Sequence, residues 1–156
     1  MAKLKLSSDV LQALKGRRLA TAESLTGGGI GAALTAVSGA SAVYAGGIIS
    51  YTNEAKHRLL GVPMELLEEL GAVSQPVAQA MAEGARMALE ADAAVSVTGL
   101  AGPGGDEFGN PVGTVFIGYS DRRDAFARRY QFTGSREEIR EQTIEAALEL
   151  VYQQNS

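Results

Sequence analysis

The stretch RLATAESLTGGGIGAALT, residues 18–35, decides the fold of this sequence. Residues 18–22 have the composition of a short β-strand, three glycines follow at 27–29, and residues 30–37 have the composition of a helix. A strand, a glycine turn and a helix in this order are typical of α/β proteins. The stretch therefore predicts a strand that ends at a glycine-rich loop beside a helix.

The same patterns predict the remaining elements on both sides of this stretch. Further strands are expected at residues 45–51, 93–98, 112–120 and 125–132. Helices are expected at residues 9–16, 53–60 (capped by Asn53), 63–71, 74–88 and from 135, where Ser135 and Glu138 form a capping box. The polar tail from Gln153 is expected to fray.

The connections between these elements predict the topology. Helices separate the first three strands, so right-handed crossovers make them parallel. The Gly/Pro-rich segment 100–111 has no helical pattern and residues 121–123 form a tight turn, so the fourth strand is antiparallel and the fifth is parallel to the first three. The prediction is one domain over residues 1–156, a three-layer α/β/α sandwich with a mixed five-stranded sheet.

Composition narrows the classes of function. The chain has 156 residues, a net charge of −4, one histidine and no cysteine, and 6% of its residues are aromatic. This acidic balance disfavours nucleic-acid binding, and the residue types leave no disulfide and no expected metal site or cofactor. No stretch has the length of a signal peptide's apolar region or of a membrane span, so we expect a cytoplasmic protein without membrane contact.

Three side chains are expected at the carboxyl edge of the parallel strands. Ser24, Tyr51 and Thr98 end the first, second and third strands, and open α/β sheets bind ligands at this edge. If the first strand lies between the other two, Ser24 and Thr98 flank the switch point. Residues 26–31 would then offer free backbone N–H groups to a phosphate or a developing oxyanion. The alternative is that the glycines serve close packing of helix and strand.

Ser24 is a candidate nucleophile, for which a base is required. The candidates are Lys56 in a serine–lysine arrangement and His57, and adjacent helical residues point about 100° apart. We place Lys56 at the site and His57 on the surface. The alternative is that Ser24 caps a helix and Lys56 is solvated.

Two further features have both a functional and a plain interpretation. Residues 99–105 form either a ligand-binding loop or a simple turn. Arg136 and Arg140 share one face at the start of the last helix, where the helix dipole disfavours positive charge. They either bind an anionic ligand or pair with Glu137 and Glu141.

Five segments, in this order and spacing, resemble the CinA C-terminal domain family over roughly residues 6–152. They are AESLTGGGIGAALT (22–35), YTNEAK (51–56) with LLGV after it, GAVSQPVAQAMAEGAR (71–86), VTGLAGPGG (97–105) and PVGTVFIG (111–118). The resemblance implies a fold related to the anticodon-binding-domain-like group, with an antiparallel fourth strand. It also implies hydrolysis of nicotinamide mononucleotide to nicotinic acid mononucleotide and ammonia without metal, the activity of the family's stand-alone members.

The resemblance also implies roles for individual residues. Ser24 matches the family's proposed nucleophile, Tyr51 and Lys56 match its proposed catalytic partners, and Thr98 and Arg140 match substrate-site positions. Together with the loops above, the expected substrate-binding residues are Thr26, Gly27, Gly28, Thr98, Gly99, Gly102, Arg136 and Arg140. The sequence departs from the family at Leu25, where some members carry cysteine, and has no counterpart of the molybdopterin-binding-like N-terminal domain of longer members.

Two classes of function remain for the same pocket. The first is an amidohydrolase acting on a small nucleotide, with backbone N–H groups after Ser24 stabilising the oxyanion. The second is a non-catalytic nucleotide-sensing or protein-interaction domain, because a fold and a pocket do not establish turnover. A homo-oligomer is expected in either case.

Overall fold

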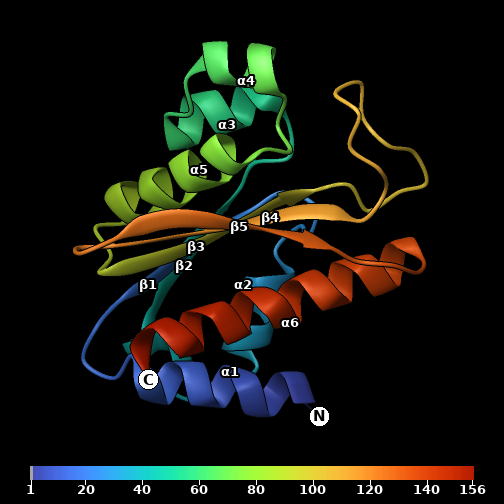
Figure 1. Cartoon of the computed structure of the whole chain (residues 1–156). Helices are drawn as coiled ribbons and strands as arrows, with labels where there is room; N and C mark the ends of the chain where they lie inside the picture. Colours follow the sequence, from blue (N-terminus) through green and yellow to red (C-terminus); the bar gives the residue numbers. More distant parts are fainter. Residues whose placement is uncertain (1) are drawn as a thin grey trace.

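The five expected strands form one mixed sheet in the computed structural model, which describes residues 2–156 (Figure 1). The strands are β1 Leu19–Glu23, β2 Tyr44–Ile49, β3 Ala93–Gly99, β4 Thr114–Asp121 and β5 Ala125–Gln131. Their order is β2-β1-β3-β4-β5; β1 is parallel to β2 and β3, and β4 is antiparallel to both neighbours. The predicted topology, with an antiparallel fourth strand, is confirmed.

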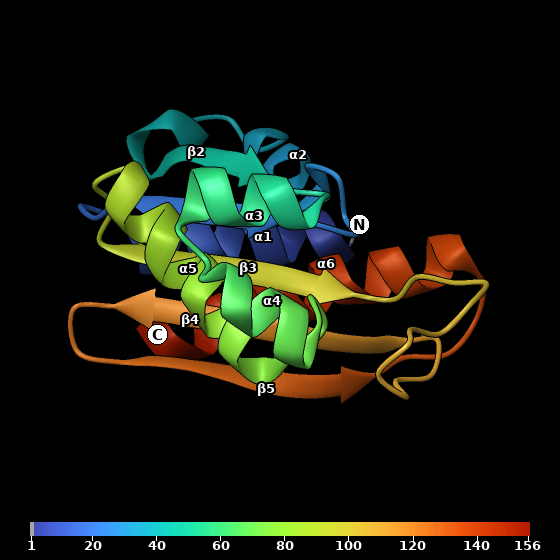
Figure 2. The ribbon, with the colours of Figure 1, turned by 90° about the horizontal axis from the view of Figure 1, so that it is seen from above.

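Helices cover both faces of this sheet (Figures 1 and 2). One layer contains α1 Ala2–Ala13, α2 Gly29–Thr35 and α6 Arg136–Asn155; the other contains α3 Asn53–Leu60, α4 Met64–Leu70 and α5 Gln75–Ala88. A short 3₁₀ turn, Ala40–Ala42, precedes β2. Each layer buries its own hydrophobic cluster against the sheet. The predicted three-layer α/β/α sandwich is therefore confirmed.

The central strands are buried on both faces, which explains their sequences. Every residue of β1 is buried, and its side chains alternate between the two layers. Ala20 and Ala22 pack toward α5, whereas Leu19 packs toward α1 and α6. Small residues also bring the helices close: a Cβ at Gly84 of α5 would collide with the carbonyl oxygen of Leu60.

Two helix starts differ from the prediction. α1 begins at Ala2 rather than at residue 9: its first turns pack on the protein, since Leu6 lies against the hydrophobic cluster and Ser7 is buried, and Lys3 also reaches Glu141 on α6 at 3.0 Å. Thr52, not Asn53, caps α3, since the Thr52 side chain accepts a hydrogen bond from the N–H of Ala55.

The C-terminal tail also differs from the prediction. Helix α6 continues to Asn155 instead of fraying at Gln153. The Asn155 side chain donates to the Tyr119 hydroxyl at 3.2 Å, which ties the last turn to the sheet. The predicted capping box at the start of α6, between Ser135 and Glu138, is confirmed.

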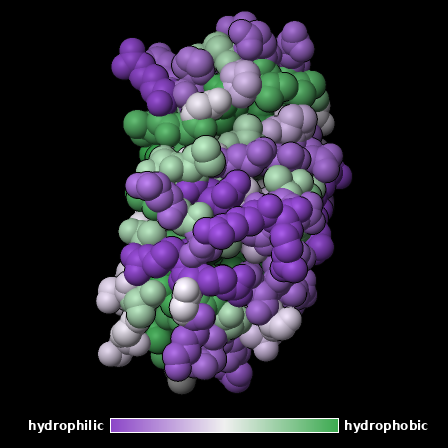
Figure 3. All heavy atoms as spheres, turned by 90° about the vertical axis from the view of Figure 1, so that its left-hand side faces the viewer, coloured by the Kyte–Doolittle hydropathy of each residue, from purple (hydrophilic) through white to green (hydrophobic). Residues whose placement is uncertain are grey.

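The two ends of the sheet can be told apart in Figures 1 and 3. Figure 3 shows the end at which the parallel strands begin, and hydrophilic atoms cover most of it. The loop that follows β3 lies at the opposite end, together with the start of α6 (Figure 1). Within residues 2–156, no helix has the length and apolarity needed to cross a membrane.

Candidate active site

Strand register places three hydroxyl residues side by side at the carboxyl edge. Glu23 of β1 pairs with Ile49 of β2 and with Val97 of β3. The ladder continues by one residue, because Ser24 N–H donates to the Val97 carbonyl at 3.2 Å and Ser50 N–H donates to the Glu23 carbonyl at 2.8 Å. Ser24 therefore lies between Ser50 and Thr98. As the switch-point argument required, β1 lies between β2 and β3.

Lys56 reaches Ser24 from helix α3. Its ammonium nitrogen, Nζ, donates to Ser24 Oγ at 3.1 Å and to the Ser50 carbonyl at 2.9 Å. Lys56 is only 2% exposed and Ser24 only 7%, so the pair is shielded from solvent. His57 points elsewhere and contacts the Val62 carbonyl through Nδ1 at 2.8 Å. Of the two bases that the sequence offered, the lysine meets the serine.

Burial changes the acid–base chemistry of Lys56. Removal from water lowers the pKa of its ammonium group from 10.5 to about 8. At pH 7 roughly one such lysine in ten is neutral, against roughly one in three thousand for an exposed lysine. A neutral amine at this position can take the Ser24 hydroxyl proton, which is the requirement for a serine–lysine nucleophile.

The shifted pKa of Lys56 makes a prediction for stability. Below pH 8 both the folded and the unfolded chain carry a protonated Lys56, and the folded chain bears the desolvation cost in full. Between pH 8 and 10.5 the unfolded chain binds more protons, so this cost disappears as pH rises. Lys56→Met removes this cost and also removes the two hydrogen bonds of the ammonium group. The net effect expected at pH 7 is a free energy of unfolding that is higher by about 1 to 3 kcal/mol.

This gain should shrink toward zero at roughly pH 10, where the wild-type lysine is neutral when folded. Urea unfolding of both proteins at the two pH values measures it. A Met variant that is less stable at both values would show that Lys56 is favourable for folding as an ammonium ion.

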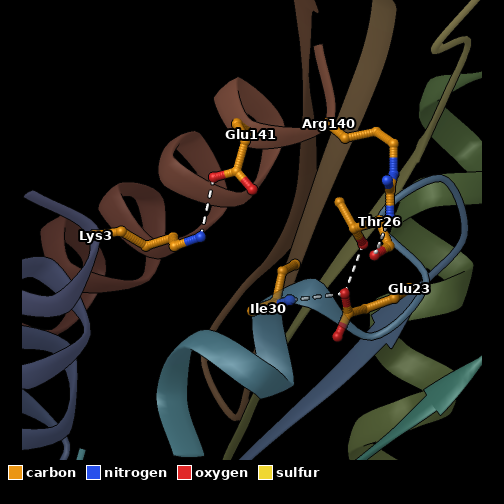
Figure 4. A network of polar contacts seen from close by, with 6 residues as sticks. All are labelled: Lys3, Glu23, Thr26, Ile30, Arg140 and Glu141. Carbon is orange, nitrogen blue, oxygen red and sulfur yellow. Dashed lines mark hydrogen bonds and ion pairs between the residues drawn. The ribbon is translucent and has the colours of Figure 1, made fainter. Parts of the chain in front are cut away.

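The glycine-rich loop is folded around the carboxylate of Glu23 (Figure 4). Glu23 is 2% exposed, and its Oε1 accepts hydrogen bonds from Thr26 Oγ1 at 2.6 Å, Ile30 N–H at 2.9 Å and Gly28 N–H at 3.2 Å. Its Oε2 accepts from Gly31 N–H at 3.0 Å. The expectation that these three N–H groups are free for a ligand was therefore wrong, because an internal carboxylate occupies them.

The loop had two alternative roles, helix capping by Ser24 and close packing by the glycines. Ser24 does not cap α2, whose N-cap is Gly28 without a side-chain hydrogen bond. The packing interpretation of the glycines holds in part, since a Cβ at Gly29 would press on Ile144 and one at Gly31 would press on the Tyr44 hydroxyl.

The two backbone N–H groups directly after Ser24 remain available. In the part of the chain that the structure describes, the N–H groups of Leu25 and Thr26 donate to no acceptor. Both residues are buried, at 4% and 1% exposure. They follow the candidate nucleophile immediately, where an oxyanion would need donors.

The two arginines of α6 hold the loops of the site together. Arg140 donates to the Leu25 carbonyl at 2.9 Å through Nε and to the Thr26 carbonyl at 3.3 Å through Nη2. Arg136 donates to the Gly102 carbonyl and, at 3.3 Å, to the Tyr51 hydroxyl. Neither forms the expected alternative pair with Glu137 or Glu141, and Glu141 pairs with Lys3 instead.

The other expected site residues have different surroundings. Tyr51 is 62% exposed, and its hydroxyl contacts Arg136 rather than Ser24 or Lys56. Thr98 is buried and donates its hydroxyl to the Ala72 carbonyl at 2.9 Å. Gly99 ends β3, and Gly27 lies beside Arg140, whose Nη2 would be 3.8 Å from an added Cβ.

Two residues of the site carried no clear sequence signal. Glu23 was visible only as a lone acidic residue in an otherwise uncharged strand, LATAE. Ser50 is fully buried, its carbonyl holds Lys56, and its hydroxyl has no hydrogen-bond partner among the described residues. Their register beside Ser24 would have been the only means of finding them.

A groove of about 660 Å³ lies next to this site, between α1, α2 and α6. Thr26, Gly29, Arg140 and Ile144 contribute to its lining, but Ser24 and Lys56 do not. It thus meets the nucleophile loop from the side of Arg140. Among residues 2–156, no three acidic or histidine side chains are grouped as ligands for a metal ion.

Fold and site together define an α/β/α protein with a buried serine–lysine pair at the carboxyl edge of a mixed sheet. A family model described as the CinA C-terminal domain matches residues 3–155. The chain belongs to this family.

Known relatives agree with this membership. The chain is 48% identical over 132 residues to "Nicotinamide-nucleotide amidohydrolase PncC" of Pseudomonas putida, covering 85% of this chain and 82% of that protein. It is 51% identical over 148 residues to a CinA-like protein of Parasynechococcus marenigrum, and it spans about a third (35%) of that relative's length. The crystal structure of competence/damage inducible protein CihA from Agrobacterium tumefaciens matches with a TM-score of 0.96 and 39% identity, covering 100% and 97% of the two chains.

Proposed function

We propose that this chain hydrolyses the carboxamide of nicotinamide mononucleotide, giving nicotinic acid mononucleotide and ammonia. The observation that carries the proposal is the 3.1 Å contact between the buried Lys56 amine and Ser24 Oγ. The substrate class is supported by 48% identity to the Pseudomonas putida protein named for nicotinamide-nucleotide amidohydrolysis.

The chemistry follows from the positions of these groups. Neutral Lys56 takes the Ser24 proton as Oγ attacks the carboxamide carbon. The N–H groups of Leu25 and Thr26 donate to the resulting oxyanion. The Lys56 ammonium then returns the proton to the leaving nitrogen, ammonia departs, and an ester on Ser24 remains. Lys56 next activates a water that cleaves this ester. In a variant of the scheme, the same groups activate water directly and no ester forms.

The substrate would be held at the mouth of the site by the loops that Arg136 connects. In this proposal residues 99–105, with Gly99 and Gly102, contact the ribose, and Arg136 with the unused N–H groups of Arg140 faces the phosphate. Tyr51 would contact the ligand beside Arg136. Alternatively, its hydroxyl would leave Arg136 and bind Lys56, where it would assist the proton transfer. Thr26, Gly27, Gly28 and Thr98 would shape the wall of the site.

The proposal also covers the location, the partners and the assembly of the enzyme. It acts on a small nucleotide in the cytoplasm, without metal, cofactor, nucleic acid or membrane, and as a homo-oligomer. The net charge of −4 supports the exclusion of nucleic acid.

Ammonia release from nicotinamide mononucleotide, measured with and without EDTA, tests the proposed function. We expect one ammonia per nicotinic acid mononucleotide formed, at the same rate in both solutions. Binding of the nucleotide without release of ammonia would overturn the proposal in favour of a non-catalytic sensing domain. Activity lost with EDTA and restored by a divalent cation would overturn the metal-free mechanism.

A further inference from the structure

The Glu23 carboxylate is the most fully bonded side chain near the nucleophile. It is 2% exposed, it forms no ion pair among the described residues, and it accepts four hydrogen bonds. A buried carboxylate is strongly unfavourable unless hydrogen bonds replace its water. Here all four donors belong to residues 26–31, the loop and first turn that follow Ser24. The charge is therefore stabilised only while this loop keeps its present shape.

Glu23 and Arg140 hold the same loop from opposite sides (Figure 4). Glu23 binds its donors, whereas Arg140 binds the carbonyls of Leu25 and Thr26. Thr26 is held by both, through its hydroxyl and its carbonyl. Arg140 thus fixes the peptide unit between Leu25 and Thr26, which carries the Thr26 N–H, while the preceding unit, which carries the Leu25 N–H, is held by the Gly27 N–H donating to the Ser24 carbonyl at 3.2 Å.

The Glu23 backbone also connects to the lysine. Its carbonyl accepts the Ser50 N–H at 2.8 Å, and the Ser50 carbonyl accepts from Lys56 Nζ at 2.9 Å. Glu23 thus contacts both parts of the site: its side chain binds the loop after Ser24, and its carbonyl is linked through Ser50 to Lys56.

We propose that Glu23 is a positioning residue, which holds the Ser24 loop so that Oγ lies against Lys56 and the N–H groups of Leu25 and Thr26 face the reacting oxygen. It does not touch the substrate. Its carboxylate also keeps the amides of Gly28, Ile30 and Gly31 from binding the substrate phosphate. The inference rests on the proposed function where it is tested by turnover of the nucleotide. Where it is tested by chemical labelling of Ser24, it rests on the Ser24–Lys56 geometry alone.

Glu23→Gln tests the proposal with almost no change of volume. A glutamine oxygen at the Oε1 position keeps three acceptor contacts, but its NH₂ group then faces the N–H of Gly31, donor against donor. We expect kcat for nicotinamide mononucleotide to fall by about 10- to 100-fold, because small displacements of reacting groups have effects of this size. KM should change by less than about threefold, and the pH midpoint set by Lys56 should stay in place.

Leu34→Ala is the matched control. Leu34 is fully buried on α2 in the hydrophobic cluster and donates no hydrogen bond to the Glu23 carboxylate, so its truncation destabilises the same helix through apolar packing. It should lower the melting temperature at least as much as Glu23→Gln and keep kcat, measured well below both melting temperatures. Thr26→Val, which removes only the 2.6 Å hydrogen bond, should lower kcat in the same direction by a smaller factor.

A second readout does not depend on the natural substrate. Diisopropyl fluorophosphate forms a bond from Ser24 Oγ to phosphorus with loss of fluoride, and Lys56 takes the proton. We expect the rate of Ser24 labelling, followed by mass spectrometry, to fall at least about tenfold in Glu23→Gln and to be unchanged in Leu34→Ala.

The outcomes separate this inference from the proposed function. If the wild-type chain is labelled at Ser24 but releases no ammonia from the nucleotide, the proposed function fails, and the labelling rates alone decide the role of Glu23. A folded Glu23→Gln variant with labelling and kcat within about twofold of wild type would overturn the inference. So would equal losses in Leu34→Ala, or a wild-type chain that is neither labelled nor active.

Discussion

Ser24→Ala is expected to lower kcat for nicotinamide mononucleotide by roughly four orders of magnitude or more, because it removes the attacking oxygen and no other group can replace it. Folding should be nearly unchanged. The Ser24 hydroxyl oxygen accepts a hydrogen bond from Lys56 and caps no helix, and alanine leaves the backbone bond to Val97 in place. Binding of the nucleotide should also persist, since the proposed contacts to ribose and phosphate come from other loops.

Single-turnover kinetics and calorimetric titration of the nucleotide measure these two effects separately. Residual activity within about tenfold of wild type would remove Ser24 from the role of nucleophile. Loss of binding together with activity would instead place Ser24 among the substrate contacts.

Lys56→Arg is expected to be almost as inactive as Lys56→Met. Arginine keeps the positive charge but cannot give up its proton near neutral pH, so it cannot act as the base. The site is also too closed for the larger group, since Lys56 is 2% exposed and already spans Ser24 and the Ser50 carbonyl. Both variants should lose activity by a factor of about 10³ or more.

Measuring kcat/KM for both Lys56 variants, after thermal unfolding has shown that each is folded, distinguishes a base from a fixed cation. An arginine variant that keeps at least about 10% of wild-type activity, a barrier change near 1.4 kcal/mol, would contradict the role of general base. Equal inactivity of arginine and methionine agrees with a general base, and the pH dependence of kcat/KM separates this explanation from poor fit of the larger guanidinium group.

The directions of the strands could be predicted from the sequence because they depend on the lengths of the connections, whereas the place of β1 between β2 and β3 entered the sequence analysis only as a condition that the structure then met. The lengths of the connections make β1, β2 and β3 parallel and β4 antiparallel whatever the side chains do. The position of Ser24 at the sheet's carboxyl edge follows from the same argument, as does its neighbour Thr98.

Contacts between distant parts of the chain could not be predicted in this way. The first turns of α1 pack through Leu6 against the hydrophobic cluster, and the last turn of α6 is tied to the sheet by the contact of Asn155 with Tyr119. The sequence placed both termini by local propensity, which is weaker than such tertiary contacts. The helix boundaries near the two ends of the chain therefore depend on residues that are far away in the sequence.

The role of Glu23 depends on backbone shape that composition does not reveal. Gly27 and Gly28 have φ angles of 59° and 104°, and this left-handed turn directs the following N–H groups back at the strand. The sequence predicted the glycine turn and the N–H groups, but not that the chain supplies their acceptor. Arg140 is similar, because its carbonyl partners on the Ser24 loop lie more than a hundred residues away.

The pH dependence of kcat/KM for nicotinamide mononucleotide tests the central claim, a neutral Lys56 that activates Ser24, most directly. This parameter reports ionisations of the free enzyme, in which burial lowers the pKa of Lys56 to about 8. Since the neutral amine is the active form, kcat/KM should rise by about tenfold per pH unit below the pKa and become level above about pH 8. A profile that is flat through this range, or that still rises toward pH 10.5, would contradict the account.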